Sequence, residues 1–386
     1  MTPRRRRSIA AWLRFCVIAA TGLSVIPIQA ASAASGAFEF DSPSGLAFGG
    51  GHLWVTNEAG NSVSEINPSN GSWIATLSGN NYGFNHPTAI VRSGLNLFIA
   101  NGAGSVSEIR ADTGALVRVI AGPQFHFVNP VAIEGTGRSV LVLNAGRSNE
   151  AGSITVIDTR TGSLLRTVSG SRFSFADPVA LAVSGPDVFV ANKSGNSVTE
   201  VSIAQGRLLR VVAEQGLNAP DGIAVGAGHV WVADRGSNAV TELAATTGAV
   251  IGTYTDSDGS YGFGSPSTVI GSGGNIFVAS PFGTSPMVTK LSALNGRPSW
   301  YMCNTNGPYY FSRLSAFAVS SGQLWVASQS GANSATPSAR TGSLTELSTG
   351  NGALITTLPT TTNSSPTTTS TTTTSTTTTS TTTTSP

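Results

Sequence analysis

The chain has 386 residues, of which 40% are hydrophobic and 10% charged, and it contains 45 glycines. This length and apolar content suffice for a sizeable buried core. The low charge and high glycine content argue against long, salt-bridged helices and favour short strands joined by tight turns, so we expect an all-β protein.

The first 33 residues have the three parts of a secretory signal peptide: a basic run at 4–7, an apolar stretch at 15–28 and small residues at 31–33. The apolar stretch holds about 14 residues, fewer than the roughly 20 needed to span a bilayer. We therefore predict that residues 1–33 are cleaved and that the protein is secreted or held at the cell surface, without an integral membrane segment. The general secretory route and the twin-arginine route both fit this leader.

The charge of the mature chain bears on its partners. Loss of the leader removes five of 21 basic residues and leaves 16 against 19 acidic ones, a net charge of about −3. A protein that binds nucleic acid needs a basic patch to neutralise the phosphate backbone. The composition thus predicts no nucleic-acid partner.

A repeat of about 45 residues fills the central part of the chain. Short apolar strands begin at equivalent positions in seven copies: Pro43, Pro87, Pro130, Pro178, Pro220, Pro266 and Leu314. A four-stranded propeller blade has this length. Residues 34–358 are therefore predicted to form a monomeric seven-bladed β-propeller with four antiparallel strands per blade.

Two columns of large apolar residues recur at fixed phase. The first lies on the second strand of each repeat: Trp54, Phe98, Leu141, Phe189, Trp231, Phe277 and Trp325. The second lies three residues before each repeat starts: Phe40, Phe84, Phe127, Phe175, Leu217, Phe263 and Phe311. Since a recurrence this regular fits symmetry better than a single site, we expect both columns to pack between blades.

The third strand alternates polar and apolar residues, as in 197–201, which indicates one buried face. Its polar column is Glu65, Glu108, Val156, Glu200, Glu242, Lys290 and Glu346. We expect these side chains to form a solvated face on separate blades, with no role in acid/base chemistry.

The repeat also predicts how the ring closes. The chain begins with a first strand and ends with a fourth, so no terminal strand is exchanged. Blades seven and one are then expected to meet through side chains alone.

The fourth and fifth repeats carry a family resemblance. The fifth reads PDGIAV from Pro220 and VWVADRGSNAV from Val230, and the fourth reads VFVAN from Val188 and SGNSV from Ser194. These stretches resemble the NHL and YVTN type of propeller repeat, and the resemblance covers residues 43–358. Propellers of this type include extracellular sensor domains, secreted binding proteins and lyases that act on streptogramin antibiotics. The resemblance implies a fold, and a shared fold does not transfer a reaction.

No catalytic or metal-binding constellation emerges from the sequence. The histidines at 52 and 229 precede second strands, whereas His86 and His126 lie in inter-blade loops on the other face, so no three can share a zinc ion. The segment 256–259 resembles the start of a calcium loop, but Ser267 stands where a bidentate Glu is required. No Gly-x-Ser-x-Gly elbow is present with plausible partners. We predict no metal and no cofactor, and a protein that is more plausibly a binder than an enzyme.

The candidate binding residues lie in loops, where repeat proteins carry their sites. An aromatic segment after the sixth repeat offers Trp300, Tyr301, Tyr309, Tyr310 and Arg313. Aromatic rings stack on apolar ligand faces and Arg pairs with carboxylates, which suits a glycan or a peptide. The remaining candidates are His86, His126, Asp234 and Arg235.

Three functions remain open at this stage. The leading hypothesis is a non-catalytic module that binds a glycan, peptide or protein through its loop-rich face. A lyase or hydrolase acting at the channel mouth and a structural cell-surface protein are the alternatives. The tail at 359–386 is nearly all Thr and Ser, so we predict that it is disordered and resembles an O-glycosylated stalk.

Overall fold

In the computed structural model the described residues are 40–147, 150–213, 216–257, 259–281, 285–303, 309, 311–329 and 342–358. The predicted leader, the Thr/Ser tail, Tyr310 and Asp258 lie outside them. The described strands form seven separate four-stranded antiparallel sheets, each with its strands in chain order. This confirms the predicted seven-bladed propeller.

The first four blades take up residues 43–212. They consist of β1 (Pro43–Gly49), β2 (His52–Asn57), β3 (Ser62–Ile66) and β4 (Trp73–Leu77); β5 (Pro87–Ser93), β6 (Asn96–Asn101), β7 (Ser105–Arg110) and β8 (Leu116–Ile120); β9 (Pro130–Gly135), β10 (Ser139–Asn144), β11 (Ser153–Asp158) and β12 (Leu164–Val168); and β13 (Pro178–Ser184), β14 (Asp187–Asn192), β15 (Ser197–Ser202) and β16 (Arg207–Val212).

The last three blades follow the same plan. They consist of β17 (Pro220–Gly226), β18 (His229–Asp234), β19 (Ala239–Ala244) and β20 (Val250–Thr255); β21 (Thr268–Ser272), β22 (Asn275–Ser280), β23 (Met287–Ser292) and β24 (Pro298–Cys303); and β25 (Leu314–Ser320), β26 (Gln323–Ser328), β27 (Ser343–Ser348) and β28 (Leu354–Leu358).

Short 3-10 turns are the only helices among the described residues: η1 (Asn80–Tyr82), η2 (Pro123–Phe125), η3 (Ser171–Phe173) and η4 (Arg235–Ser237). None of these has the length and apolar character of a membrane span.

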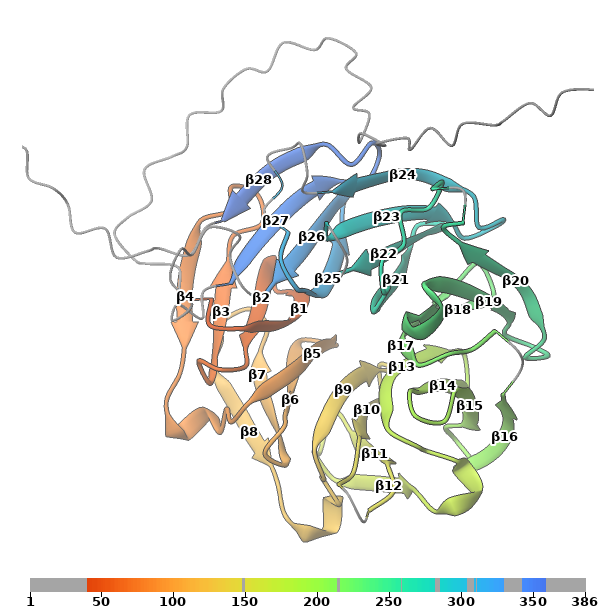
Figure 1. The fold of residues 1–386 in the computed structure, drawn as a ribbon. Helices are drawn as coiled ribbons and strands as arrows, with labels where there is room; N and C mark the ends of the chain where they lie inside the picture. Colours follow the sequence, from red (N-terminus) through yellow and green to blue (C-terminus); the bar gives the residue numbers. More distant parts are fainter. Residues whose placement is uncertain are drawn as a thin grey trace, which may run out of the picture.

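The blades stand around a common axis, with the first strand of each blade innermost and the fourth outermost (Figure 1). Because consecutive strands are antiparallel, every first strand starts, and every second strand ends, on the same face of the ring. We call this the mouth face. The turns between first and second strands and between third and fourth strands lie on the opposite face, which we call the turn face.

The core consists of apolar clusters between neighbouring blades. The side chains at the second-strand position are almost completely buried, from Trp54 at 0% exposure to Phe189 at 3%. In the second column every residue except the half-buried Phe127 is buried. Four of its rings stack on the aromatic residue two positions earlier, for example Phe125 on Phe127 at 5.4 Å between centroids. Both columns therefore pack between blades as predicted.

The predicted solvated face on the third strand is wrong. The five glutamates of that column are at most 6% exposed. Alternation with a period of two indicates one buried face in an open sheet, but in a propeller both faces of a blade lie against neighbouring blades. The polar column is therefore buried as well.

The buried glutamates are held by polar partners. Arg118 and Arg210 pair with Glu108 and Glu200, each at 2.6 Å between nitrogen and carboxylate oxygen, and His52 pairs with Glu65. Burial raises the pKa of these three carboxyls. Asn96 and Arg118 oppose that rise at Glu108 and His52 opposes it at Glu65, whereas at Glu200 the opposing Arg210 is partly offset by Asp187.

Ring closure follows the predicted order of strands, since β1–β4 form one sheet and β25–β28 another. The expectation of contact through side chains alone is wrong. The amide of Gly342 donates a hydrogen bond to the carbonyl oxygen of Phe40 at 2.6 Å, in addition to the bond from Ser315 Oγ to the carbonyl oxygen of Pro43 at 2.6 Å. A backbone bond therefore joins blade seven to the segment that precedes blade one.

Candidate ligand-binding site

The mouth face is built from three rings, each with one residue per blade. The outermost lies directly before the first strand and has left-handed backbone, with φ between 44° and 56°: Ser42, His86, Asn129, Asp177, Ala219, Ser265 and Arg313. In five blades the carbonyl oxygen of this residue accepts a hydrogen bond from the amide of the residue that follows the second strand, for example from Glu58 N to Ser42 O at 3.0 Å and from Gln329 N to Arg313 O at 3.2 Å. This turn fixes where both residues stand at the mouth.

The second ring is the residue after the second strand, and it varies widely in charge: Glu58, Gly102, Ala145, Lys193, Arg235, Pro281 and Gln329. The third ring is the residue after the prolines or Leu314 that start each repeat: Ser44, Thr88, Val131, Val179, Asp221, Ser267 and Ser315. Members of all three rings line a cavity of about 340 Å³ at the centre of the mouth.

The hydroxyls of the third ring tie neighbouring blades together. Ser44 Oγ donates to the carbonyl oxygen of Pro87 at 2.6 Å, and Thr88 Oγ1 donates to that of Pro130 at 2.9 Å. The floor of the cavity is thus both polar and rigid.

An ion-pair network connects blades four and five at the mouth. Lys193 Nζ lies 2.8 Å from Asp221 Oδ1, and a guanidinium nitrogen of Arg235 lies 3.2 Å from Asp221 Oδ2. One carboxylate therefore holds two cations, which leaves this side of the mouth with a net charge of +1.

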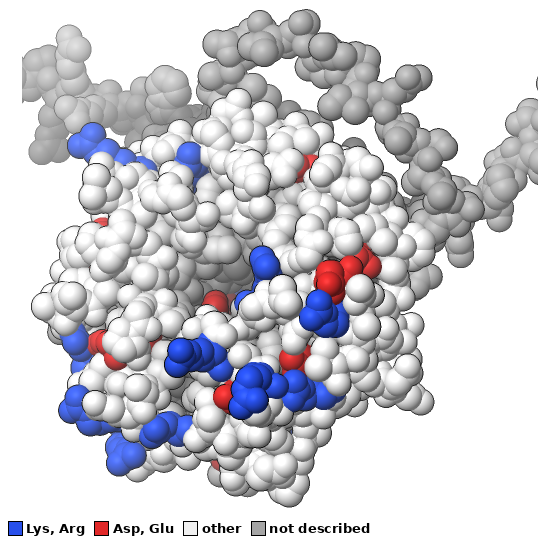
Figure 2. Space-filling model, turned by 180° about the vertical axis from the view of Figure 1, so that it is seen from behind, with Lys and Arg blue, Asp and Glu red and all other residues white. Residues whose placement is uncertain are grey.

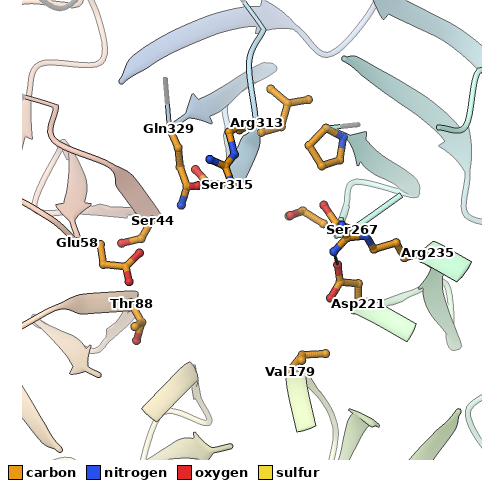
Figure 3. Close-up of a pocket in the computed structure, with 13 residues that line it drawn as sticks. Ser44, Glu58, Thr88, Val179, Asp221, Arg235, Ser267, Arg313, Ser315 and Gln329 are labelled. Carbon is orange, nitrogen blue, oxygen red and sulfur yellow. Dashed lines mark hydrogen bonds and ion pairs between the residues drawn. The ribbon is translucent and has the colours of Figure 1, made fainter. Parts of the chain in front are cut away.

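Blades seven and one present two charged side chains that have no partner among the residues the structure describes. In the described part of the chain, no hydrogen bond or ion pair engages the side chain of Arg313 or that of Glu58. Figure 3 shows Arg313 beside Ser315 and Gln329, with Glu58 on the neighbouring side of the cavity and Asp221 with Arg235 across it. The cavity thus offers a free cation and a free carboxylate on adjacent blades.

The predicted site residues separate into three groups. Arg235 and Arg313 line the cavity. His86 lies in the same left-handed ring as Arg313 and is exposed, with its Nδ1 3.1 Å from Asn85 Oδ1. His126 is an exposed residue that ends η2 and does not line the cavity. Asp234 is completely buried beneath Arg235.

The aromatic candidates do not gather at the mouth. Trp300 lies on the outermost strand β24 and packs on Phe277, with 6.0 Å between ring centroids. Tyr309 stacks on Phe311 at 5.5 Å and donates a hydrogen bond to Met302 Sδ at 3.2 Å. Tyr301 is half-buried in β24, and Tyr310 lies outside the described residues. These rings stabilise the interface between blades six and seven, since Trp300 and Tyr309 pack against its apolar cluster.

Sequence reasoning missed Glu58, Lys193, Asp221 and Gln329. For Glu58, Lys193 and Gln329 the signal was present in the register of the repeat, because the position after the second strand carries a different side chain in every blade. Asp221 is the one acidic residue at its own repeat position, which serine, threonine or valine fills in the other blades. A search for features that the blades share passes over the positions at which they differ.

The described residues contain no group of three or more His, Cys, Asp or Glu side chains that could hold a metal ion. His52 and His229 each pair with the glutamate of their own blade on the turn face. In the calcium-like segment, Asp256 Oδ1 accepts hydrogen bonds from the amides of Tyr261 and Gly262 at 2.9 and 2.8 Å. That oxygen therefore caps the loop.

The fold and the mouth define a seven-bladed propeller with a polar central cavity. Residues 39–254 match the family described as outer membrane protein assembly factor BamB. Since the match spans more than half of the 386 residues, this chain belongs to that family. No curated protein matches the chain.

Several solved structures share the fold at low sequence identity. Virginiamycin B lyase from Staphylococcus aureus superposes with a TM-score of 0.59 at 14% identity, over 75% of this chain and 92% of the lyase. A streptogramin B lyase gives 0.59 at 16% identity, over 75% and 91%. The computationally designed Ika8 protein gives 0.58 at 16%, over 83% and 87%. At these identities the likeness shows the fold alone.

Proposed function

We propose that this protein is an exported, non-catalytic binding module that engages a peptide segment of a partner protein at the channel mouth. The observation that carries the proposal is the pair of unpartnered charges, Arg313 and Glu58, on adjacent blades of one polar cavity. A peptide supplies carboxylate and ammonium or guanidinium groups at the spacing of its side chains. The description of the family as an assembly factor is in keeping with a protein partner.

A glycan is less well supported than a peptide. Sugar rings are usually held by exposed aromatic faces, and the aromatic segment that suggested a glycan packs between blades six and seven. The described residues that line the cavity include no aromatic side chain.

Within the described part of the mouth, no set of titratable groups converges in the way that catalysis requires. An enzyme concentrates residues of shifted pKa at one place. Burial raises the pKa of Glu134, Asp234 and Glu346 to about 7, but these carboxyls belong to blades three, five and seven and none lines the cavity. The lyase hypothesis draws only on the shared fold.

Selection from a phage-displayed library of random dodecapeptides tests the proposal. We expect enriched peptides to carry both an acidic and a basic residue. Arg313→Gln removes the charge but leaves a side chain with a β-carbon at the left-handed position, so the backbone strain does not change. It should weaken peptide binding at least ~10-fold, since a hydrogen bond to a charged group contributes about 1.5–3 kcal/mol.

Arg297→Gln is the matched control, because it removes an exposed arginine from the turn face of blade six. Failure to enrich any peptide, or equal weakening by Arg313→Gln and Arg297→Gln, would contradict binding at the mouth.

A further inference from the structure

A second charged surface lies on the turn face, opposite the mouth. Figure 2 shows the face turned away in Figure 1, where Lys and Arg atoms gather over the lower half of the ring, the part formed by β5 to β16. We use the name arginine surface for Arg118, Arg138, Arg160, Arg166, Arg207 and Arg210.

Three of these arginines occupy one position on the fourth strand of consecutive blades and reach across to the next blade. Arg118 donates to the carbonyl oxygen of Arg160 at 3.0 Å, Arg166 to that of Gln205 at 2.6 Å, and Arg210 to that of Thr246 at 2.8 Å. The guanidinium groups are therefore held in place at a repeat of one per blade.

The acidic residues nearby neutralise the surface only in part. Asp187, half-buried at the start of β14, adds a carboxylate in blade four near Glu200. Glu108 and Glu200 lie buried beneath Arg118 and Arg210. Asp158 Oδ1 accepts hydrogen bonds from the amides of Arg160 and Thr161 at 2.9 and 2.8 Å. These bonds lower its pKa, and its charge is directed into the turn. In blade three the glutamate position is Val156, so Arg166 has no carboxylate beneath it.

Two arginines of the surface have exposed, unengaged guanidinium groups. Among the described residues, no hydrogen bond or ion pair is made by the guanidinium group of Arg138 or of Arg160, although both backbones are hydrogen-bonded. They stand on neighbouring turns, because Thr159 N donates to the carbonyl oxygen of Arg138 at 3.1 Å. Arg207 adds a third exposed cation on blade four.

The other half of the turn face lacks this arrangement. Its Lys290 donates to the carbonyl oxygen of Thr349 at 2.8 Å, and His52 and His229 are paired with glutamates. Arg297 alone among its arginines and lysines is exposed within the described residues. The excess of cationic donors is thus confined to blades two to four.

We propose that the arginine surface binds an acidic polysaccharide. Guanidinium groups pair bidentately with carboxylate and sulfate, and cations repeated once per blade suit a polymer that carries an anion on each repeating unit. Nucleic acid is the less favoured polyanion, because the predicted mature chain carries a net charge of about −3. This surface is separate from the mouth, so the two binding proposals can fail independently.

Binding of the full-length protein to immobilised heparin and polygalacturonate tests the inference, with neutral dextran as the blank. We expect binding to both polyanions that weakens steeply as salt rises. Arg138→Gln combined with Arg160→Gln should lower the affinity at least ~10-fold without lowering the unfolding midpoint, since neither side chain holds the fold.

Arg172→Gln combined with Arg297→Gln is the matched control, because it removes the same charge from exposed arginines outside the surface. We expect it to change the affinity less than about twofold. Equal losses of affinity in the two double variants would show that binding depends only on the net charge of the protein. No binding to either polyanion at low salt would overturn the proposal. Tighter binding to duplex DNA than to either polysaccharide would assign the surface to nucleic acid instead.

Discussion

At the last position of the second strand, four blades carry asparagine and the fifth carries Asp234. The amide nitrogen of each asparagine donates to hydroxyls of the third strand, as from Asn192 to Thr199 at 2.9 Å. In blade five one of the two hydroxyl positions is Ala239. Asp234 is completely buried, and burial raises the pKa of its carboxyl to about 7 against the opposing effect of the Thr241 hydroxyl and the Asn218 amide. The position that carries a neutral amide in four blades thus carries an ionisable carboxyl in blade five.

Asp234→Asn should stabilise the protein above neutral pH. The native carboxyl holds its proton up to a pKa of about 7, whereas the ordinary value is 3.8. Its contribution to stability is therefore full below pH 4 and is lost as pH rises through 7. A shift of this size corresponds to about 4 kcal/mol at most, so we expect a gain of about 2–4 kcal/mol at pH 8 and little at pH 4. Urea unfolding at the two pH values measures it.

Asn192→Asp provides the reverse control in blade four. It should destabilise the protein at pH 8 more than at pH 4. A gain from Asp234→Asn that is equal at both pH values would show that the charge is not the cause.

At the scale of the strand and turn, an asparagine before the third strand links one blade to the next. Asn61, Asn196 and Asn238 have φ between 45° and 51°. Their Oδ1 atoms accept hydrogen bonds from the amides of His86, Ala219 and Ser265 at 2.7 to 2.8 Å. Each donating amide belongs to the left-handed ring of the following blade, so this asparagine orients the residues of the mouth.

Asn196→Ala should therefore cost about 2–3 kcal/mol, from the lost hydrogen bond and from a β-carbon in a left-handed conformation that alanine tolerates less well than asparagine. Asn196→Gly removes the bond but not the conformation, so it should cost about 1 kcal/mol less. Thermal unfolding of the two variants measures the difference. If alanine and glycine cost the same, the backbone conformation makes no contribution.

The repeat predicted those features that every blade shares. Trp54 and Trp231 were assigned to the core because a large side chain at the same phase in seven copies must fill equivalent space, and both are buried. Glu65 was misassigned because period two does not distinguish a sheet with one buried face from a blade with two. Trp300 was misassigned because a sequence does not show whether an aromatic residue near a loop faces solvent or a neighbouring blade. Asp221 was missed because its chemistry depends on Lys193 and Arg235, which meet only in the folded ring.

For the whole molecule, closure of the ring depends on the seam between blades seven and one. Every other pair of neighbouring blades is also joined by the chain itself, whereas the seam has only noncovalent contacts. These are the Ser315 and Gly342 hydrogen bonds and an apolar cluster that includes Phe40, Trp325 and Leu358. The seam is therefore the place where opening costs least.

Amide hydrogen exchange should be faster in the two blades at the seam than elsewhere in the ring. We expect the amides of β1–β4 and β25–β28 to exchange before those of β9–β16 under native conditions, because local opening precedes global unfolding. Ser315→Ala should accelerate exchange in these two blades. Ser44→Ala, which removes the equivalent bond to Pro87 between blades one and two, should leave the order unchanged. Exchange that is uniform around the ring would rule out the seam as the weak point.

The hydroxyl bonds between first strands at the mouth and the arginine bonds on the turn face run in one sense around the ring. Ser44 donates to the blade after it, Ser315 donates across the seam to the first, and Arg118, Arg166 and Arg210 each reach forward. These bonds therefore give the same polarity to each blade interface that contains one, from blade seven through blade five. A blade docked in the opposite sense at these interfaces would place donors opposite donors, so a blade can be added or removed there only in the native direction.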